Sequence, residues 1–403
     1  MMNRFEPEYY TSRLIVDLDR LVENYRKTLE AAGQELIPVV KGNAYGFGIR
    51  EVTECLVKDC GAKIIAVSRL SEALEIEDIC RPDADLLVLM PLREKQLEAA
   101  VANDFQFAIC SEEDAELASE EAARQGKERV RVQIKIETGL NRFGVKPGKP
   151  LEKLLDKVKA LGNLAITGVY THFASSDEAS GPEGNDFTRE QFARFKDAVY
   201  QVKARGFSPQ YIHCANTGGI LWLKETREIC THARNISLIY GYSYMEGDWN
   251  PLGVKEVATL RCRITNLKTV EPGETVGYGR SFLAKRETKL ALISFGYGDG
   301  YPRDLAVKKG GKVLVCGVKC PLVFMCMDTA MVDVTGVDCE VGDEVTIFGE
   351  DGRGNEISLM KETRYLMGET VCVLLTHITD RVARIYVKDG KEYIPSVVER
   401  CNG

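Results

Sequence analysis

The segment ELIPVVK, residues 35–41, is a short apolar run that ends on a lysine, and similar runs recur across the first 245 residues. Such runs are typical of strands buried on both faces of a parallel sheet. The other runs cover residues 62–68, 84–90, 105–110, 130–136, 165–173, 210–216 and 235–241. Charged, helix-prone segments that open with N-cap residues separate them, as at 111–125 and 186–205. This α/β alternation predicts a (β/α)8 TIM barrel over residues 13–245. A doubly wound open sheet is the alternative.

The pattern changes near residue 250. Closely spaced strand patterns broken by Gly, Pro and Asp follow, and one helical stretch at 355–375 interrupts them. They predict a second, mainly antiparallel β domain over residues 246–403. An additional strand at about residues 5–17 runs into a helix, and we expect it to pair with this domain.

Composition sets the broad class of the protein. With 403 residues, 44% hydrophobic and 28% charged, the chain is expected to be a soluble protein of two domains. A net charge of -7 argues against nucleic-acid partners and anionic membranes. No apolar run approaches the roughly 20 residues of a membrane helix, and the start MMNRFEPEYY lacks a secretory signal. We expect a cytoplasmic protein that binds neither nucleic acid nor membrane.

The thirteen cysteines do not indicate a metal site. Many lie inside apolar runs, where cysteine behaves as a small hydrophobic residue. Cys316 and Cys320 form the closest pair, but no second pair accompanies them and the four histidines are far apart. Structural zinc sites use four clustered ligands, so reduced, mostly buried thiols are the preferred interpretation.

In a barrel, the active site lies at the carboxyl ends of the strands. That rule selects Lys41, the segment after Ile136, His172, the pair Asn216 and Thr217, and Tyr240 with Gly241. A lysine at a barrel mouth can have its pKa lowered by desolvation and act as a base or a Schiff-base nucleophile. A structural lysine with its ammonium in water is the alternative for Lys41.

The segment VVKGNAYGFG, residues 39–48, resembles the signature around the cofactor lysine of alanine racemases. Further matches follow in the family's order and cover nearly the whole chain. The resemblance implies pyridoxal 5'-phosphate (PLP) as cofactor, held covalently by Lys41, with Tyr45 bonded to its phosphate.

Two following segments carry further implied roles. KIETGLNRFG resembles the family segment that holds a carbamylated lysine, here Lys135, and a substrate-side arginine, here Arg142. An arginine fork near the cofactor can hold its phenolic oxygen, and a carbamate on Lys135 would orient that arginine. THFASSDE places His172 against the cofactor ring.

HCANTGG implies a phosphate-side role for Asn216 and Thr217, and ARNISLIYG places Arg234 opposite the pyridine nitrogen. An always-charged donor keeps that nitrogen unprotonated, which weakens the ring as an electron sink and disfavours transamination. A decarboxylase on a similar barrel generally has a carboxylate there. A surface arginine is the alternative for Arg234.

Racemisation needs a second base on the opposite face of the substrate Cα. ETVGYGRSF resembles the family's catalytic tyrosine loop and gives this role to Tyr278. Because a tyrosine side chain has a reference pKa near 10, it needs cationic or hydrogen-bonding neighbours, and a His172–Arg234 chain is the expected supplier. In the family this tyrosine comes from the partner subunit, which implies a head-to-tail homodimer with shared active sites.

Two more segments resemble the substrate side of the family's site. SFGYGDGYPR implies that Tyr297 and Arg303 lie at the entry to the site. FMCMDTAMV supplies Met327 and Asp328, with a backbone N–H near Met327 for the substrate carboxylate. In isolation, these tyrosines would more often be packed aromatic residues in strands.

The sequence departs from the family pattern at several positions. Asp380 stands where alanine racemases usually have a tyrosine that contacts the phosphate and narrows the substrate pocket, and Ala383 replaces a proline. A carboxylate beside a phosphate is repulsive unless a cation or a reoriented loop intervenes. Phe47 replaces a common histidine, Ile236 and Ser237 replace the usual pair, and Ser237 is expected to donate to the phosphate.

The leading hypothesis is therefore racemisation of L- and D-alanine for cell-wall precursor supply, by Lys41 and Tyr278 as opposed bases. Asp380 motivates an alternative, a serine or broad-specificity amino acid racemase with a larger and more polar pocket. Two more hypotheses are a PLP-dependent decarboxylase and a non-catalytic PLP-binding protein. Arg234 argues against the decarboxylase, and a full β domain that carries Tyr278 argues against the binding protein.

Overall fold

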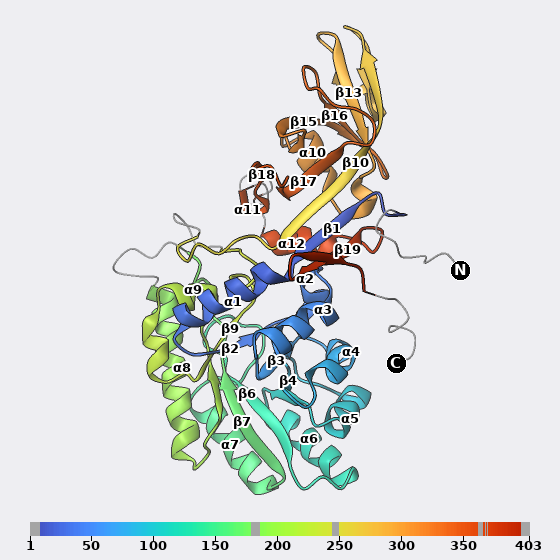
Figure 1. Ribbon diagram of the computed structural model, residues 1–403. Coiled ribbons are helices and arrows are strands. Elements are labelled where there is room, and N and C mark those ends of the chain that lie inside the picture. The colour runs from blue at the N-terminus through green and yellow to red at the C-terminus, as the bar shows by residue number, and fades with distance from the viewer. Residues whose placement is uncertain are drawn as a thin grey trace, which may run out of the picture. The chain divides into compact units, whose positions relative to one another are not determined.

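The computed structural model describes residues 9–178, 186–243, 250–361, 366, 368 and 370–395 (Figure 1). The chain divides into two compact units. One, the barrel unit, consists of Val22–Ala44 and Ile49–Val254. The other, the β unit, consists of Met1–Leu21, Tyr45–Gly48 and Lys255–Gly403. The domain limits expected from the sequence stay predictions.

In the described part of the barrel unit, eight parallel strands form one sheet in the order β2-β9-β8-β7-β6-β5-β4-β3. A parallel bridge between Val39 and Ala66 joins the first strand to the last, so the sheet closes on itself. The predicted (β/α)8 barrel is thereby confirmed and the open doubly wound sheet excluded. The strands are β2 (Glu35–Pro38), β3 (Ile64–Val67), β4 (Asp85–Val88), β5 (Gln106–Ile109), β6 (Val130–Lys135), β7 (Leu164–Tyr170), β8 (Tyr211–His213) and β9 (His232–Asn235).

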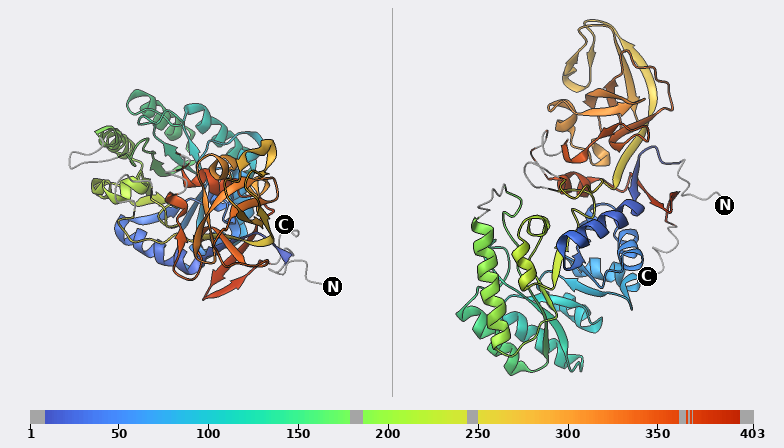
Figure 2. Two further views of the ribbon diagram at one scale, coloured as in Figure 1. Left: turned by 90° about the horizontal axis from the view of Figure 1, so that it is seen from above. Right: turned by 60° about the vertical axis from the view of Figure 1, so that its left-hand side comes forward.

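Helices surround this sheet (Figure 2). The expected helix at 111–125 is present as Glu112–Arg124, and Ser111 caps it by accepting a hydrogen bond from the Asp114 N–H at 3.1 Å. The helical elements up to residue 228 are α1 (Leu18–Ala32), α2 (Lys41–Tyr45), α3 (Ile49–Glu54), a π-helical turn (Cys55–Asp59), α4 (Leu70–Cys80), α5 (Glu94–Ala102), α6 (Glu112–Arg124), α7 (Lys149–Leu161), α8 (Asp186–Ala204), α9 (Thr217–Leu221) and a 3-10 turn (Lys224–Glu228).

The predicted position of the eighth barrel strand is wrong. Residues 235–241 were expected to form it, but the strand is β9, and the following residues form turns. The Asn235 side chain accepts a hydrogen bond from the Leu238 N–H at 3.0 Å, which favours a turn directly after the strand. The turn residues 238–241 are buried and apolar, and a buried turn cannot be told from a buried strand by hydrophobicity alone.

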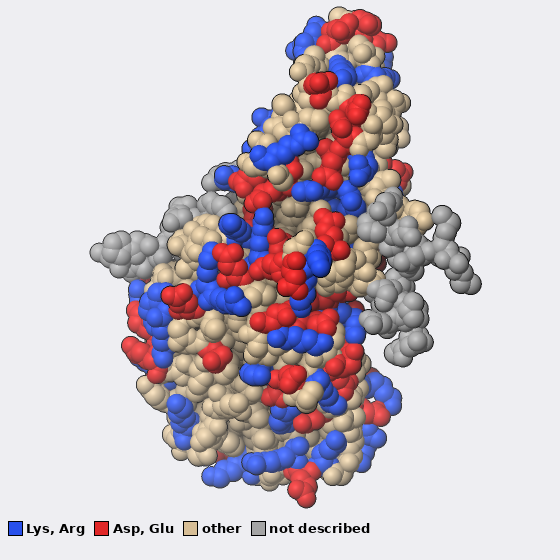
Figure 3. All heavy atoms as spheres, in the orientation of Figure 1, with Lys and Arg blue, Asp and Glu red and all other residues tan. Residues whose placement is uncertain are grey.

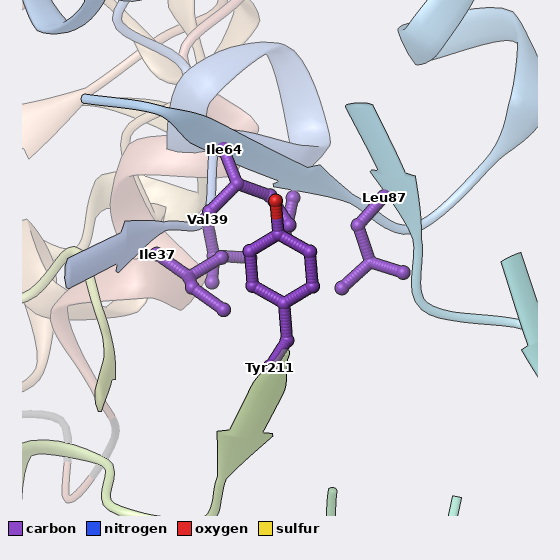
Figure 4. Packing of buried hydrophobic residues seen from close by; sticks show 6 residues of the cluster. Ile37, Val39, Ile64, Leu87 and Tyr211 are labelled. Atoms are coloured by element: carbon purple, nitrogen blue, oxygen red, sulfur yellow. The ribbon is translucent and has the colours of Figure 1, made fainter. Parts of the chain in front are cut away.

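One cluster of side chains in the barrel interior is apolar. Figure 4 shows the Tyr211 ring among Ile37, Val39, Ile64 and Leu87, side chains that come from well-separated parts of the sequence. Each of these residues is at most 9% exposed. Burial of one such side chain contributes about 1.5–3 kcal/mol to folding, so this layer gives the barrel a rigid base.

In the described part of the β unit, ten strands form a second sheet, which is antiparallel except where β1 runs parallel to β19. The strands β10, β13, β16, β15, β14 and β17 close into a ring, because β17 pairs again with β10. The predicted mainly antiparallel domain is confirmed. Its strands are β1 (Arg13–Asp17), β10 (Ala258–Val270), β13 (Thr288–Ile293), β14 (Lys312–Val315), β15 (Val318–Met325), β16 (Ala330–Asp333), β17 (Glu344–Glu350), β18 (Glu356–Ile357), β19 (Ala383–Lys388) and β20 (Lys391–Tyr393), with the separate hairpin β11 (Thr275–Val276) and β12 (Phe282–Leu283).

The helical stretch expected at 355–375 is interrupted. It begins with strand β18, continues as α11 (Leu359–Lys361), and ends in α12 (Val371–His377); residues 362–365, 367 and 369 lie outside the described residues. The Glu256 carboxylate accepts hydrogen bonds from the Ser358 hydroxyl and the Leu359 N–H at 2.8 and 3.0 Å. This contact across more than 100 positions fixes where α11 starts, and sequence periodicity carries no sign of it.

Acidic and basic side chains are interspersed on the face shown in Figure 3. Among the described helices, none is long and apolar enough to cross a bilayer. No disulfide joins the cysteines of the described ranges, and these ranges contain no cluster of three or more His, Cys, Asp or Glu suited to a metal ion.

Candidate active site

Lys41 lies three residues after the end of strand β2 and directly before a turn of left-handed backbone. The φ angles of Gly42, Asn43, Ala44 and Tyr45 are 64°, 55°, 52° and 58°. For residues other than glycine this region is strained by an amount on the order of 1–3 kcal/mol, and such strain clusters at functional sites. The turn redirects the chain immediately beyond the lysine, at the carboxyl end of the barrel strands.

Specific hydrogen bonds hold this turn in place. The Gly42 N–H donates to the Glu72 carboxylate at 2.7 Å, and the Asn43 side chain accepts from the Ile49 N–H at 2.8 Å. The Tyr240 hydroxyl donates to the Ala44 carbonyl at 3.0 Å. The sequence had placed Tyr240 at the barrel mouth, and the structure assigns it this supporting contact.

Arg234, on β9, forms hydrogen bonds with several groups at the barrel mouth. It is 5% exposed. Its Nη1 donates to His213 Nδ1 at 2.7 Å, and its Nη2 donates to the Thr171 carbonyl at 2.6 Å and to His172 Nδ1 at 3.0 Å. β9 pairs with β2, with Arg234 opposite Ile37, so this guanidinium lies on the strand next to the one that leads to Lys41.

These contacts fix the protonation of two histidines. Arginine only donates, so Nδ1 of both His172 and His213 must accept, and the ring proton of each neutral imidazole is on Nε2. Burial lowers the pKa of His172 well below 6.5, and the positive charges of Arg234, Arg142, Lys135 and Lys41 lower it further. Burial also lowers the pKa of His213, and Arg234 adds to the effect. Both rings are therefore neutral at neutral pH.

Lys135, the last residue of β6, is buried beside other cations. Burial, and after it the charges of Arg142 and Arg234, lower its pKa to about 8. Its Nζ lies 5.1 Å from the Phe143 ring centroid. Among the described residues, Lys135 forms no ion pair with a carboxylate. The site therefore favours a group that brings negative charge to this lysine.

The loop after β6 carries Arg142, which is exposed. Glu137 organises this loop, because its carboxylate accepts hydrogen bonds from the backbone N–H groups of Gly139 and of Arg142. Glu137 had no role in the sequence analysis. A glutamate directly after an apolar strand, followed by glycine two residues later, is the signal that indicates such a loop-closing acceptor.

Asn216, Thr217 and Ser237 lie at the ends of β8 and β9. The Asn216 side chain caps α9 and accepts from the Ser176 hydroxyl at 2.7 Å. The Thr217 hydroxyl accepts from the Asn235 amide at 3.0 Å, so its own proton is available to a further acceptor. Ser237 is half-buried in the turn after β9. This edge of the mouth can offer hydroxyl donors to an anion.

In the β unit, Phe324 is a platform for two sequence-predicted residues. Tyr278 packs edge-on against its ring with centroids 5.8 Å apart, and the Arg303 guanidinium lies 5.0 Å from the same ring. Gly277 permits this approach, since an added Cβ would lie 2.4 Å from the ring. The Tyr278 side chain itself is 70% exposed.

The other candidate residues of the β unit lie on two touching loops. The Tyr297 N–H donates to the Cys326 carbonyl at 3.0 Å, next to Met327. Arg381 pairs with Asp328 at 2.6 Å and with Asp299 at 3.2 Å. A chain of contacts thus ties together the segments that carry Tyr297, Met327 and Asp328.

Asp380 is fully solvent-exposed, and its carboxylate lies 3.8 Å from the Arg384 guanidinium. Arg384 also donates to the carbonyls of Ile378, Thr379 and Val382, which fixes the loop around Asp380. A cation therefore lies near this carboxylate, which is one of the two arrangements that would relieve its repulsion from a phosphate.

The predicted site residues thus fall into two groups. The barrel unit brings together a first group at its mouth: Lys41, Lys135, Arg142, His172, Asn216, Thr217, Arg234 and Ser237. The β unit carries the second group: Tyr45, Tyr278, Tyr297, Met327 and Asp380. Sequence reasoning gave no role to His213, although it lies in a quoted motif, and none to Gln133, a polar residue in the middle of an apolar strand.

Comparisons with known proteins follow the two units. A model of the alanine racemase N-terminal domain matches residues 16–244, and one of the alanine racemase C-terminal domain matches residues 257–386. A relative from Caldanaerobacter subterraneus subsp. tengcongensis, alanine racemase 2, is 34% identical over 394 residues, which cover 96% of this chain and 97% of that protein.

Two solved structures are also similar over nearly their full lengths. The alanine racemase of Bartonella henselae, described with covalently bound pyridoxal phosphate, matches with a TM-score of 0.81 and 26% identity, covering 94% of this chain and 99% of that one. The Bacillus anthracis alanine racemase, described with bound L-Ala-P, matches with a TM-score of 0.85 and 27% identity, covering 98% and 100%.

Proposed function

The chain belongs to the alanine racemase family, and on that premise we propose that it interconverts L- and D-alanine with PLP held on Lys41. The observation that carries the proposal is the pairing of β2, the strand that ends three residues before Lys41, with the neighbouring strand β9. β9 presents the buried donor Arg234. The family's activity is isomerisation, and the homologue from Bartonella henselae holds PLP covalently.

The charges at the barrel mouth fit a phosphorylated cofactor. Four cations act on His172, namely Arg234, Arg142, Lys135 and Lys41. The hydroxyl of Thr217 has a proton to donate at the same end of the strands. A phosphate and a substrate carboxylate would supply the anions that such a cluster stabilises. These donors and cations support PLP as the cofactor of this chain.

When bound, PLP withdraws electrons from the substrate Cα and makes its proton acidic. We assign Lys41 as the base on one face of that carbon and Tyr278 as the base on the other. Arg234 would donate to the ring nitrogen of the bound cofactor and keep it unprotonated, because a guanidinium does not give up its proton. His172 offers its Nε2–H as a donor and does not act as a base. Racemisation then requires a proton to leave one face and return on the other.

Tyr278 supports a homodimer with shared active sites. A base that acts on a substrate needs a protected position, yet this side chain is 70% exposed in the single chain. Leu283 and Met327 of the same unit are 53% and 51% exposed. Large exposed apolar side chains are enriched in subunit interfaces. We therefore place Tyr278 in the site of a partner subunit.

We also propose that Lys135 carries a carbamate. With a pKa of about 8, about a tenth of its amine is neutral at pH 7, far more than for an ordinary lysine, and this neutral amine attacks carbon dioxide with release of one proton. The carbamate would replace a cation by an anion between Arg142 and Arg234, whose charges both lower the pKa of Lys135. The buried cationic surroundings thus favour the modified form.

Asp380 supports a second candidate, a serine or broad-specificity racemase. Its carboxylate stands on a loop fixed by Arg384 and adds a polar group where the family has a ring. The purified holoenzyme tests both candidates when it is offered L-alanine, L-serine and longer polar amino acids and the products are resolved by chirality. D-alanine as the main product supports the first candidate, and a preference for another amino acid supports the second. Release of carbon dioxide, or no reaction with any of them, would overturn the proposal.

A further inference from the structure

A line of buried polar side chains crosses the barrel interior below Arg234. His213 Nε2 lies 2.8 Å from Gln133 Oε1, and Gln133 Nε2 lies 2.8 Å from Gln106 Oε1. Gln106 Nε2 lies 3.0 Å from Asp85 Oδ2. His213, Gln133 and Gln106 are each 0% exposed. The residues come from strands β8, β6, β5 and β4, so the line runs across the inside of the barrel.

Both ends of this line impose the same direction on its hydrogen bonds. At the mouth, Arg234 can only donate, so His213 accepts at Nδ1 and donates from Nε2 to Gln133. At the other end the Asp85 carboxylate, paired with Arg131 at 2.7 Å, can only accept, so Gln106 turns its NH2 group toward it. The orientations of the two amides between them are then fixed, and each hydrogen bond of the line is donated in the direction of Asp85.

The local backbone is adapted to this line. The pairing of β6 with β7 shifts register at Val132 and Gln133, and the register skips Thr167. At this bulge the Thr167 hydroxyl donates to Gln106 Oε1 at 2.7 Å. Gly168 faces Gln133, and a Cβ there would lie 2.4 Å from Gln133 Cδ. A bulge and a glycine each weaken the interior of a strand. The space that the Gln133 side chain needs explains why both occur here.

We propose that Gln133 and Gln106 are positioning residues for the reaction. They orient His213 so that its Nδ1 accepts the hydrogen bond from Arg234. This contact fixes the guanidinium and, through it, the Nε2–H tautomer of His172. The inference rests on the proposed function, which gives Arg234 and His172 their roles. A side-chain amide neither gains nor loses a proton at neutral pH, so this line carries no proton across the barrel. It supplies a fixed orientation, and buried networks of this kind are stable only when every member is satisfied.

The lowered pKa values of both histidines agree with this arrangement. Burial is the largest cause for each, and Arg234 is the largest charge acting on each. The remaining charged groups that face them are Arg142, Lys135 and Lys41 for His172, and His232 for His213. All of these favour the neutral ring, so the tautomers are expected to persist across neutral pH.

The test is 15N NMR of the histidine side chains in the PLP-loaded enzyme. The sequence has four histidines, and the variants His232→Gln and His377→Gln identify the other two by loss of their signals. We expect His172 and His213 each to show a bare Nδ1 and a protonated Nε2, unchanged between pH 6 and pH 9. A protonated Nδ1 on either ring in this range would overturn the inference. This outcome does not depend on which amino acid the enzyme accepts.

Two variants then test transmission along the line. Gly168→Ala displaces Gln133 without removing a polar group, and Gln106→Met breaks the line one step away from His213. Each is expected to shift the His213 nitrogen signals and to lower kcat about tenfold, with a smaller change in KM, because small displacements of positioned groups are costly. The control Ser119→Ala removes the hydrogen bond of 2.7 Å to Asn163, outside the line, and should shift neither.

If Gly168→Ala does not fold, Gln106→Met decides. Unchanged His213 signals in a folded Gln106→Met enzyme would show that the glutamines do not position His213. Shifted signals with an unchanged kcat would show that they do not serve the reaction. If the wild type racemises no amino acid, the proposed function fails, while the nitrogen signals still report whether the line exists.

Discussion

Nη2 of Arg234 lies 3.0 Å from Nδ1 of His172, and both side chains are held in the carboxyl-end layer of the barrel. Because arginine has no acceptor, this distance fixes both the tautomer and the charge of the histidine. His172 is a neutral donor toward the mouth. The contact therefore determines which proton transfers the site can perform, and it underlies the predictions that follow.

Arg234→Lys should lower kcat about 100-fold while the protein still folds. A lysine keeps the charge but has a single terminal nitrogen, so it cannot bond His172, His213 and the Thr171 carbonyl in the geometry of the fork. Steady-state racemisation measures the effect. Arg205→Lys, which retains a surface ion pair with Asp156, is the matched control. Equal activity of the two variants would contradict the role of Arg234.

The stability of the protein should fall as the pH drops below about 6.5. Below that value the unfolded chain protonates its histidines. In the folded state burial keeps the pKa of His172 and His213 well below it and lowers that of His232 to about 4. The unfolded state then binds more protons, so the free energy of unfolding decreases with falling pH, by up to about 1.4 kcal/mol per pH unit for each histidine.

Urea unfolding at pH 7.5, 6.5 and 5.5 measures this slope. His232→Asn should make the slope shallower, because it removes one of the histidines that take up a proton on unfolding. A slope in this variant equal to that of the wild type would show that His232 is protonated in the folded state.

Tyr278→Phe should reduce racemisation about 10³-fold, the range expected for loss of one general acid–base group. Folding and PLP binding should survive, because the side chain is 70% exposed in the single chain. Tyr200→Phe, at a tyrosine of α8 that is 54% exposed, is the control. A wild-type rate in Tyr278→Phe would show that Tyr278 is not the second base and would favour a protein that only binds PLP.

Lys135 should be carbamylated in solution. Enzyme equilibrated with 13C-labelled bicarbonate is expected to show a carbamate carbon signal that increases as the pH rises through about 8, because the neutral amine is the reacting form. Lys135→Ala should lack the signal. An equal signal in that variant would assign the modification elsewhere.

Asp380→Tyr should narrow the substrate range. A ring in place of the exposed carboxylate fills the space expected for a larger or polar substrate side chain, so the ratio of kcat/KM for serine over alanine should fall. Asp338→Tyr, also at an exposed carboxylate of the β unit, should leave that ratio unchanged. A ratio equal to that of the wild type would make Asp380 irrelevant to specificity.

The fold was predictable because each barrel strand is an apolar run between charged helices, as in ELIPVVK and VRVQIKI. The prediction is wrong at residues 235–241, where the Asn235 side chain starts a turn that hydrophobicity cannot reveal. The stretch at 355–375 differs from its prediction for a similar reason, since Glu256 sets the start of α11 from a distant part of the chain.

The candidate site was predictable only as a set of residues in recognisable motifs. The partners that set their protonation were not, because they lie far apart in sequence: Gln133 and His213 are 80 positions apart, and Gln133 and Gln106 are 27 apart. A glutamine in the middle of an apolar strand was the visible signal. Its partner, its direction and the glycine that makes room for it appear only in the folded barrel.

The most direct test of the central claim is deuterium incorporation at the Cα of L-alanine in D2O, followed by NMR and by separation of the enantiomers. The wild-type holoenzyme is expected to place deuterium at Cα and to form D-alanine until the two enantiomers are equal, and Lys41→Ala is expected to do neither. No deuterium at Cα of alanine, with intact PLP binding, would contradict the assignment of this chain as an enzyme that racemises alanine.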